Sequence, residues 1–241
     1  MVGLTECEVT AVIPVYNDRS ALERAIPESL RRLEEITGSF ELLVAEDGSD
    51  DGSAELVAEW EGRDPRVHLL HSDERLGRGR ALTRAFHASK GRIFCYYDVD
   101  LATDMAHLGE LIDAIRSGCA VATGSRLMPE SRVDRDSRRE IASRGYNALV
   151  RMILGSRLYD HQCGFKAFSR ACLEALLPSV QSPHWFWDTE LLVLAQHRGF
   201  RVCEFPVRWH QGEGTTVTLS DVTGMGSEIL RLRWRLHAEK D

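Results

Sequence analysis

The sequence predicts an α/β protein in which a mostly parallel central sheet carries helices on both faces. Two observations lead to this class. Short apolar runs, typical of buried strands, alternate with longer amphipathic stretches, which are typical of helices. Several of the apolar runs stop abruptly at acidic residues, as expected where strands end together at one edge of a sheet. Strands and helices that alternate through right-handed crossovers build a parallel sheet of this kind.

The first half of the chain contains four strand-like runs separated by helical stretches. The strands are predicted at residues 9–15, 40–45, 67–71 and 93–97, and the helices at residues 22–36, 54–60 and 80–90. Ser53 can cap the second of these helices. Pro27 interrupts the first helix, which is therefore expected to be kinked or divided into two shorter helices.

The second half is less regular, and its elements follow from apolar periodicity alone. Helices are predicted at residues 137–154, 187–197 and 220–237, a strand or turn at 162–168, and a strand at 200–207. In the last helix Met225, Ile229, Leu232 and Leu236 share one face. That face either rests on anionic lipid headgroups or docks onto the rest of the domain.

Length and composition limit the possible classes of protein. At 241 residues, with 43% hydrophobic and 28% charged residues, the chain suits one large globular domain spanning residues 1–241. No internal repeat or flexible linker divides it. The net charge of −7 argues against a nucleic-acid-binding protein, although arginines gather at residues 126–157 and 231–235. Local contacts with anions or membranes are therefore compatible with the composition.

The cysteines and the hydropathy pattern indicate a cytoplasmic protein. None of the six cysteines forms a Cys-x-x-Cys pair, and most lie in apolar runs, so buried free thiols are expected. The six are Cys7, Cys95, Cys119, Cys163, Cys172 and Cys203. No stretch approaches the ~20 apolar residues needed to span a bilayer. The N-terminus also lacks a basic and then apolar signal sequence.

Acidic residues follow three of the predicted strands. The run at residues 92–97 ends in Asp98-Val99-Asp100, and Asp18 and Asp47 follow two earlier strands. Because the carboxyl ends of parallel strands meet at one edge, these carboxylates should converge. Asp98 and Asp100 would repel each other unless a cation lay between them. Carboxylate oxygens suit Mg²⁺ or Mn²⁺, and Mg²⁺ is often bound through carboxylates and substrate phosphates together.

Two glycine-containing segments each have a functional and a structural interpretation. Residues 77–81, Gly-Arg-Gly-Arg-Ala, open a helix with free N–H groups and two cations, which suits a diphosphate. The alternative is a glycine-rich helix start with solvated arginines. Residues 46–53 are either a simple turn with capping chemistry or a loop from which Asp47 hydrogen-bonds a nucleobase.

Taken together, the motifs resemble the inverting family 2 nucleotide-sugar glycosyltransferases, which have the GT-A fold. The match covers roughly residues 9–219 and is most specific in three segments of the second half. These are Ser143-Arg144-Gly145-Tyr146-Asn147, residues 160–168 (Asp-His-Gln-Cys-Gly-Phe-Lys-Ala-Phe) and residues 187–192 (Trp-Asp-Thr-Glu-Leu-Leu). Gly124-Ser125-Arg126 resembles a further family segment at the boundary between donor and acceptor. The dolichyl-phosphate β-glucosyltransferases and dolichol-phosphate mannose synthases are the branches that the chain resembles most.

The resemblance implies a Rossmann-like sheet and roles for individual residues. It implies a nucleotide-binding half at residues 1–100, an acceptor half at 101–219 and a C-terminal amphipathic helix at 220–241. The implied nucleotide-binding residues are Pro14, Tyr16, Asp18, Asp47, Arg78 and Asp98. Asp98 and Asp100 are implied to hold Mg²⁺ or Mn²⁺, and Asp100, Arg126 and Arg144 to be catalytic. The implied acceptor-binding residues are Arg126, Arg139, Arg144, Lys166, Asp188 and Glu190.

The resemblance also implies the substrates. Ala102 stands where many relatives have a glutamine, as in the glucosyl branch, which favours UDP-glucose as the donor. The acceptor is expected to be a polyprenyl or dolichyl phosphate, reached from a peripheral position at the cytoplasmic face of a membrane. A phosphate monoester is largely a dianion at neutral pH because its second pKa is ~6, so it needs cations and no general base.

Three alternatives remain open from the sequence. The donor could be GDP-mannose. The acceptor could instead be a sugar hydroxyl, in which case Asp188 or Glu190 would remove its proton; the preferred interpretation is that these two acids orient arginines. The chain could also be a binding module for nucleotide sugars without catalytic activity.

Overall fold

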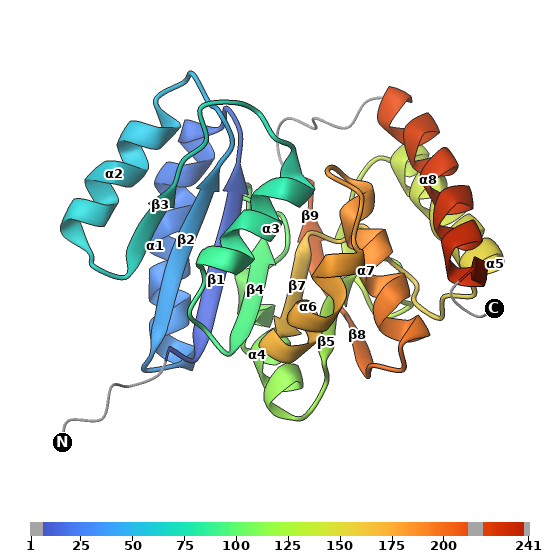
Figure 1. Cartoon of the computed structure of the whole chain (residues 1–241). Helices are drawn as coiled ribbons and strands as arrows, with labels where there is room; N and C mark the ends of the chain where they lie inside the picture. Colours follow the sequence, from blue (N-terminus) through green and yellow to red (C-terminus); the bar gives the residue numbers. More distant parts are fainter. Residues whose placement is uncertain (1–6, 212–218, 239–241) are drawn as a thin grey trace.

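The computed structural model describes residues 7–211 and 219–238. Its centre is a seven-stranded sheet with the strand order β3-β2-β1-β4-β7-β5-β8 (Figure 1). All neighbouring strands are parallel except at β7, which runs antiparallel to β4 and to β5. The strands are β1 (Val9–Val15), β2 (Phe40–Glu46), β3 (Val67–Leu70), β4 (Ile93–Tyr97), β5 (Val121–Ser125), β7 (Phe165–Ser169) and β8 (Val202–Pro206). The predicted mostly parallel α/β class is confirmed.

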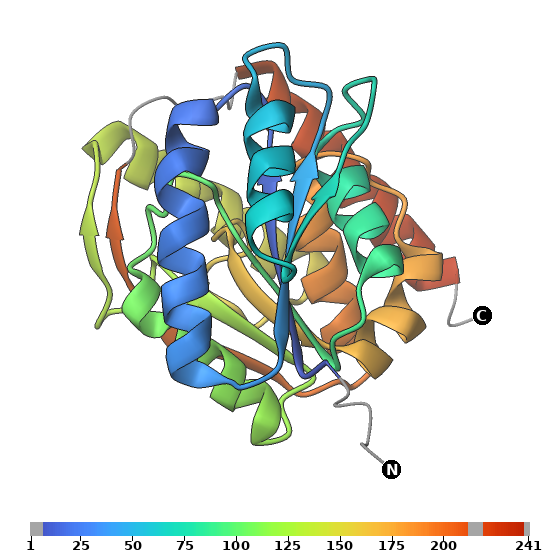
Figure 2. The same cartoon turned by 90° about the vertical axis from the view of Figure 1, so that its left-hand side faces the viewer.

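Helices cover both faces of the sheet, as predicted (Figure 2). One face carries α1 (Arg19–Ile36), α2 (Ser53–Arg63) and α4 (Leu108–Arg116). The other face carries α3 (Arg78–Ala88), α6 (Arg170–Leu176) and α7 (Phe186–His197). The remaining helices are α5 (Ser137–Leu154), α8 (Leu219–Ala238) and the short 3-10 turns η1 (Met105–His107) and η2 (Leu177–Ser179).

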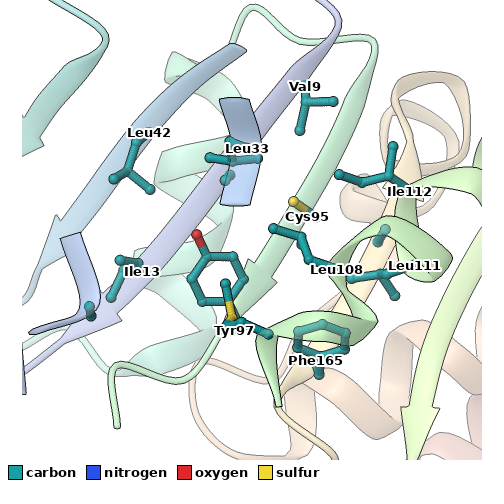
Figure 3. Packing of buried hydrophobic residues seen from close by; sticks show 14 of the residues in the cluster. Val9, Ile13, Leu33, Leu42, Cys95, Tyr97, Leu108, Leu111, Ile112 and Phe165 are labelled. Carbon is teal, nitrogen blue, oxygen red and sulfur yellow. The ribbon is translucent and has the colours of Figure 1, made fainter. Parts of the chain in front are cut away.

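Side chains alternate between two hydrophobic cores because successive residues of a strand point to opposite faces. In β1, Val9 and Ile13 enter the core beneath α1 and α4, whereas Val12 enters the core beneath α3. Figure 3 shows the first core, in which Tyr97 and Phe165 from the antiparallel pair β4 and β7 lie close to Leu108 of α4. The strand pair at the middle of the sheet is therefore buried on both sides.

Several details differ from the sequence predictions. Residues 19–36 form one helix with Pro27 inside it, so the alternative of two shorter helices is wrong. The sequence patterns did not indicate β5, α4 or α6. They also did not indicate the separate ribbon in which β6 (Arg132–Asp134) pairs in parallel with β9 (Arg208–His210). The strand or turn expected at residues 162–168 is the central antiparallel strand β7.

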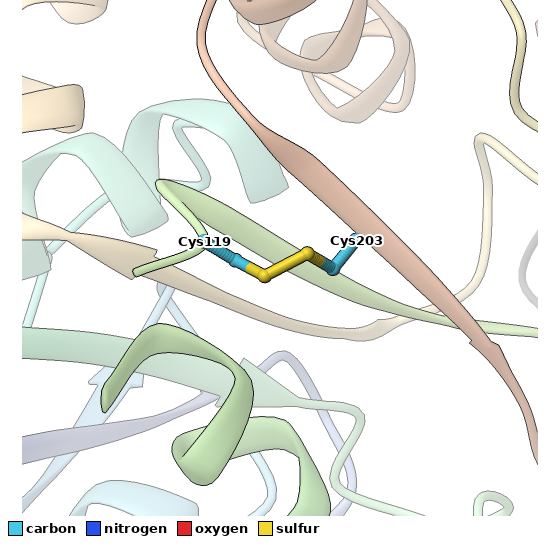
Figure 4. Close-up of a disulfide and its surroundings, with 2 residues drawn as sticks. All are labelled: Cys119 and Cys203. Atoms are coloured by element: carbon cyan, nitrogen blue, oxygen red, sulfur yellow. A yellow bond between two sulfur atoms is a disulfide. The ribbon is translucent and has the colours of Figure 1, made fainter. Parts of the chain in front are cut away.

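The expectation that all six cysteines are free is wrong, because Cys119 and Cys203 form a disulfide (Figure 4). Cys119 lies just before β5 and Cys203 lies within β8, and these two strands pair in parallel. The pairing brings the two Cα atoms to 6.0 Å, within the range that a disulfide bridges. The sequence separation of 84 residues concealed this contact. Cys7, Cys95, Cys163 and Cys172 are free thiols.

The C-terminal helix docks onto the domain. Ile229, Leu232 and Leu236 are buried, and α8 packs against α5 and α7. The docking alternative is therefore confirmed for this face, while the side chain of Met225 lies outside the described part. Within the described residues, no helix is long and apolar enough to cross a membrane.

Candidate functional site

The predicted acidic edge exists. β2, β1 and β4 are parallel neighbours, so their carboxyl ends lie at one edge of the sheet. Asp47 and Asp98 directly follow β2 and β4, and Asp18 and Asp100 lie three residues beyond the ends of β1 and β4. Burial raises the pKa of Asp100, and the negative charges of Asp98 and Asp18 raise it further. An edge on which neighbouring carboxylates raise the pKa of Asp100 attracts a cation.

Asp98 and Asp100 occupy different local positions. Asp98 accepts a hydrogen bond from Nη1 of Arg78 at 2.7 Å, and 42% of its side chain is exposed. Asp100 accepts one from the backbone N–H of Ala102 at 3.0 Å. The backbone N–H of Asp98 donates to the carbonyl of Gly164, where any Cβ atom would overlap the Asp98 carboxylate. The glycine of the motif at residues 160–168 therefore makes room for Asp98.

These two carboxylates fit a divalent metal that shares its ligands with a substrate. Within the described residues, no three His, Cys, Asp or Glu side chains are grouped to hold a metal by themselves. Two aspartates nevertheless match the common Mg²⁺ arrangement of one or two carboxylates completed by substrate phosphates. Asp98 is partly exposed, and the negative charge of Asp100 is unfavourable without a nearby cation. These oxygen ligands suit Mg²⁺ or Mn²⁺.

The residues expected to bind the nucleotide line the same edge, and most of them also support the backbone. Asp47 is buried and accepts N–H bonds from Leu76 at 2.8 Å and Gly77 at 2.9 Å. It therefore fixes the loop before α3. Asp18 caps α1 through the N–H of Ala21. Pro14 lies near the end of β1, and the guanidinium of Arg75 covers the Tyr16 ring at 3.9 Å.

Arg78 connects the two halves of the molecule. Its guanidinium lies between Asp98 and Asp188, with Nε at 3.9 Å from Oδ2 of Asp188. It also packs against the rings of Tyr96 and Trp185. Its Nε and Nη2 are buried and have no hydrogen-bond partner among the described residues. Buried donors without partners are costly, so this arginine suits an incoming anion beside Asp98.

Asp188 and Lys166 form a buried ion pair beneath the site. Nζ of Lys166 lies 3.3 Å from Oδ1 of Asp188, and the Tyr96 hydroxyl also donates to Asp188. Burial raises the pKa of Asp188 to about 7, although Arg78 opposes the shift, and burial lowers the pKa of Lys166 to about 8. Lys166 is fully buried and also donates to the Cys163 carbonyl. Lys166 is thus a charge in the interior of the protein, and its role in acceptor binding stays a prediction.

Glu190 orients an arginine, as preferred from the sequence, but that arginine lies outside the predicted acceptor set. Its Oε1 is 2.6 Å from Nη1 of Arg235 in α8. Its Oε2 accepts the N–H groups of Gln181 and Ser182. Glu190 therefore fastens the C-terminal helix.

The second cationic region surrounds Trp209. Arg126 makes a two-point ion pair with the buried Asp160, with Nε to Oδ2 at 2.7 Å and Nη2 to Oδ1 at 3.0 Å. Arg126 and Arg135 both pack against the Trp209 ring, at 5.8 and 5.7 Å. Nε and Nη1 of Arg135 are buried and lack partners within the described part of the chain. Nη2 of Arg135 donates to the carbonyl of Arg139.

The sequence did not single out Arg135 or Trp209. They come together through the β6–β9 ribbon, for which no sequence pattern was visible. Asp160, which holds Arg126, lies within the family-like segment at residues 160–168, and this segment was the sequence feature that could have identified it.

Arg144 takes a different position from Arg126. It is exposed on α5 and pairs with Glu140, with Nη2 to Oε1 at 2.8 Å. It also lines a pocket of about 420 Å³. Leu127 and Tyr159, next in sequence to Arg126 and Asp160, line the same pocket. The other lining residues are Pro129, Asn147, Ala148 and Arg151.

The histidines have structural or surface positions in the described part. His161 is buried, with its ring bonded to Asn147 and Ser156. His184 and His210 are exposed or partly exposed. None of the three approaches the acidic edge as part of a metal-binding group among the described residues.

The mostly parallel seven-stranded sheet with an acidic edge is the GT-A fold. The family model described as glycosyl transferase family 2 matches residues 10–177, and the chain belongs to this family.

Named relatives of the chain are glycosyltransferases. Glycosyltransferase AglD of Haloferax volcanii is 51% identical over 95% of this chain, which spans 37% of that protein. Polyprenol monophosphomannose synthase of Mycolicibacterium smegmatis is 32% identical, with 84% of this chain and 77% of that protein covered. A dolichyl-phosphate beta-glucosyltransferase of Saccharomyces cerevisiae is 27% identical, with coverage of 95% and 75%. The chain thus spans little more than a third of AglD.

A solved structure supports the fold. Glucosyl-3-phosphoglycerate synthase from Mycobacterium tuberculosis, in complex with Mn²⁺, UDP and glucosyl-3-phosphoglycerate, superposes with a TM-score of 0.68. The sequence identity is 18%, and the match covers 95% of this chain and 80% of that one. At this identity the likeness concerns the fold alone.

Proposed function

We propose that the protein transfers a hexose from a nucleotide sugar to a polyprenyl or dolichyl phosphate, with inversion at the anomeric carbon. One observation carries the proposal: two arginines have buried N–H groups without hydrogen-bond partners among the described residues, and they lie in separate regions. Arg78 lies beside the carboxylate pair, and Arg135 packs with Arg126 against the Trp209 ring. The first group suits the donor diphosphate and the second an acceptor phosphate. The named activities of the dolichyl-phosphate and polyprenol relatives support this assignment.

The donor side consists of the nucleotide-binding half. Pro14, Tyr16, Asp18 and Asp47 frame the nucleoside, and Arg78 offers its open N–H groups to the diphosphate. Asp98 and Asp100 would hold Mg²⁺ or Mn²⁺, which supplies positive charge that stabilises the departing nucleoside diphosphate. UDP-glucose is the favoured donor because Ala102 matches the glucosyl branch of the family that the sequence resembles.

The acceptor side needs positioning more than proton removal. A phosphate monoester is mostly a dianion at neutral pH, since its second pKa is ~6. Arg126 is held by its two-point ion pair with Asp160, and Arg135 packs against the same Trp209 ring as Arg126. The acceptor oxygen attacks the anomeric carbon from the face opposite the diphosphate. Arg139, Arg144 and the interior charges Lys166, Asp188 and Glu190 remain predicted supporting residues. The enzyme works peripherally at the cytoplasmic face of a membrane.

The site assignment is tested by Asp100→Asn. We expect transfer to fall by about 10³-fold or more, on the scale of losing one preorganised electrostatic contact. The thermal unfolding midpoint should not fall, because Asp100 is destabilised by its neighbours. Asp113→Asn, at a surface carboxylate of α4, is the matched control and should keep full activity. Full metal-dependent activity of Asp100→Asn would refute the assignment.

The substrates are tested directly with a panel of radiolabelled donors. UDP-glucose and GDP-mannose are each incubated with a polyprenyl phosphate, and the product is extracted into organic solvent. Label in the organic phase from UDP-glucose supports the proposed reaction. Label transferred from GDP-mannose alone would mean that the donor is GDP-mannose and not UDP-glucose. If neither donor gives label in the organic phase, the alternative of a non-catalytic nucleotide-sugar binding module is favoured.

A second candidate is a transferase that acts on a sugar hydroxyl. It is favoured by Asp188, whose pKa is raised to about 7, near the value that suits a general base. Against it, Asp188 is buried and already engaged by Tyr96, Lys166 and Arg78. Asp188→Asn and Glu190→Gln discriminate between the two. A phosphate acceptor should leave substantial turnover in both variants, whereas loss of a true base costs about 10²–10⁴-fold.

A further inference from the structure

One surface of the molecule is unusually apolar. Six large apolar side chains are exposed among the described residues, and all of them belong to α5, α8 or the loop after α5. Four are strongly exposed: Ile141 at 71%, Met152 at 77%, Leu230 at 61% and Trp234 at 74%. The other two are Leu149 and Tyr159. Apolar residues gathered on one exposed face mark an interaction surface, whereas single exposed ones need no explanation.

The exposed residues form stripes on two adjacent helices. Residues 141, 145, 148 and 152 follow the spacing of one helix face, and Val150 and Leu154 are buried on the opposite side of α5. On α8, Leu230 and Trp234 are one turn apart and point away from the buried Ile229 and Leu232. α5 and α8 pack together at the end of the molecule away from α1 and α2 (Figure 1). We call these stripes the α5–α8 face.

The charge of these segments is opposite to that of the whole chain. Residues 137–159 contain five arginines and one glutamate, and residues 224–238 contain three arginines and one glutamate. Together they carry a net charge of +6, whereas the chain carries −7. Arg231 and Arg233 are exposed and lie on either side of the Leu230–Trp234 stripe. Exposed apolar residues flanked by arginines match an anionic bilayer surface, where tryptophan also prefers to lie.

We propose that the α5–α8 face docks onto an anionic lipid bilayer, with Trp234, Leu230, Ile141 and Met152 entering the headgroup region and Arg231 and Arg233 contacting lipid phosphates. This proposal deepens the proposed function by naming the surface that meets the membrane. It can nevertheless be measured without any transfer reaction, so the two can fail separately.

The docking also connects the bilayer with the acceptor side. α5 contributes Arg144 and Ala148 to the pocket of about 420 Å³, and Met152 lies one turn beyond Ala148 on the exposed stripe. The pocket therefore opens beside the docking face, and its other wall includes Leu127, next to Arg126. A lipid phosphate held in the bilayer would reach the cationic region around Trp209 from this side.

The test is co-sedimentation of the full chain with vesicles of phosphatidylcholine, with and without phosphatidylglycerol. We expect binding to the anionic vesicles and much weaker binding to the neutral ones. Leu230→Ser combined with Trp234→Ser should reduce binding at least tenfold. The double variant Arg231→Ser with Arg233→Ser should reduce it by about tenfold or more, since each cation near an anionic surface contributes ~1 kcal/mol. Raised salt should weaken binding further.

The matched control is Arg24→Ser with Arg63→Ser, which removes two exposed arginines from α1 and α2 at the other end of the molecule. It should bind vesicles like the unmodified chain. An equal loss of vesicle binding in the control would mean that binding depends on net charge alone and would overturn the proposal. Unchanged vesicle binding of the Leu230 and Trp234 variant would also overturn the proposed docking through the α5–α8 face. A dimer in solution that this variant dissociates would assign the face to a second copy and also overturn the proposal.

These outcomes separate docking from catalysis. With a short-chain prenyl phosphate in detergent, the Leu230 and Trp234 variant should keep its turnover, because neither residue belongs to the proposed site. If Asp100→Asn retains transfer while the face variants lose vesicle binding, the proposed site fails and the docking face stands. If Asp100→Asn loses transfer while the face variants still bind vesicles, the proposed site stands and the proposed docking face is wrong.

Discussion

At the scale of single residues, Arg135 gives the sharpest prediction. Its Nε and Nη1 are buried without partners among the described residues, and a hydrogen bond to a charged group contributes ~1.5–3 kcal/mol. Arg135→Met should therefore raise the KM for the polyprenyl phosphate by about 10- to 100-fold, and leave the donor KM unchanged. Steady-state kinetics with each substrate varied in turn measure both. The control is Arg138→Met, an exposed neighbour, and an unchanged acceptor KM for Arg135→Met would contradict the prediction.

His161 predicts how stability changes with pH. Its Nδ1 donates to Oδ1 of Asn147 and its Nε2 accepts from Ser156, so the buried ring is neutral. Burial lowers the pKa of His161 to about 3 from its usual value of 6.5. Below pH ~6.5 the unfolded chain binds a proton that the native protein does not, so stability is lost as the pH falls toward 3.

His161→Gln removes this titration. The variant should be less stable than the unmodified chain at pH 7, and the difference should narrow on acidification by up to ~1.4 kcal/mol per pH unit below pH ~6.5. Urea unfolding at neutral and mildly acidic pH measures the difference. A gap that stays constant across this range would show that the histidine does not stay neutral in the native state.

The residues that sequence identifies are those whose position follows from one element. Asp98 and Asp100 end a buried strand, and this alone places them at the edge where ligands bind. Arg135 directly follows β6 and Trp209 lies in β9, and these two paired strands are far apart in the sequence and only three residues long. Such short exposed strands carry no apolar period, and their contact exists only in the folded chain.

At the scale of elements, the disulfide ties an edge strand to its neighbour. Cys203 lies in β8, which among the described residues pairs only with β5, and Cys119 precedes β5. Cross-linking residues 84 apart restricts the unfolded chain, and such bonds typically contribute ~2–4 kcal/mol. Cys119→Ser with Cys203→Ser should lower the free energy of unfolding by about this amount. Urea unfolding with and without reductant measures it, and the double variant should not respond to reductant.

The elements that were predicted well share a strong local pattern. β1, β2 and β4 are fully or almost fully buried apolar runs, and α1, α3 and α5 are amphipathic or well capped. β5 was missed because Val-Ala-Thr-Gly-Ser contains small and polar residues. Its burial is set by tertiary packing: at Gly124 a Cβ atom would meet Val207 at 2.8 Å. Tertiary contacts that require a small residue do not appear as hydrophobic periodicity.

At the scale of the whole molecule, the sequence predicted the layered architecture but not the order of the sheet. The antiparallel β7 lies between β4 and β5, and so joins the predicted nucleotide-binding half to the predicted acceptor half. The motif at residues 160–168 lies at this junction, where Gly164 contacts the Asp98 carboxylate and Lys166 pairs with Asp188. The motif was visible in the sequence, whereas its contact with the donor edge depends on a strand order that no local pattern encodes.

A largely buried ion pair adds to the apolar contacts that dock α8 onto this assembly. Glu190 is almost fully buried, and Arg235 satisfies its Oε1 at 2.6 Å while also donating to the Ser179 carbonyl. Removing one partner of a buried pair leaves an uncompensated charge and costs ~3–5 kcal/mol, whereas replacing both partners by uncharged groups costs much less. Arg235→Met alone should therefore destabilise the protein more than Arg235→Met combined with Glu190→Gln.

A double-mutant cycle by urea unfolding measures this coupling. The two single variants and the double variant are compared with the unmodified chain, and we expect the double variant to recover ~1–3 kcal/mol of the loss in Arg235→Met, on the scale of coupling within one ion-pair network. Arg233→Met, at the exposed neighbouring arginine of α8, should leave stability unchanged. Additive losses across the cycle would mean that α8 is held by Ile229, Leu232 and Leu236 alone, with the ion pair contributing nothing to its docking.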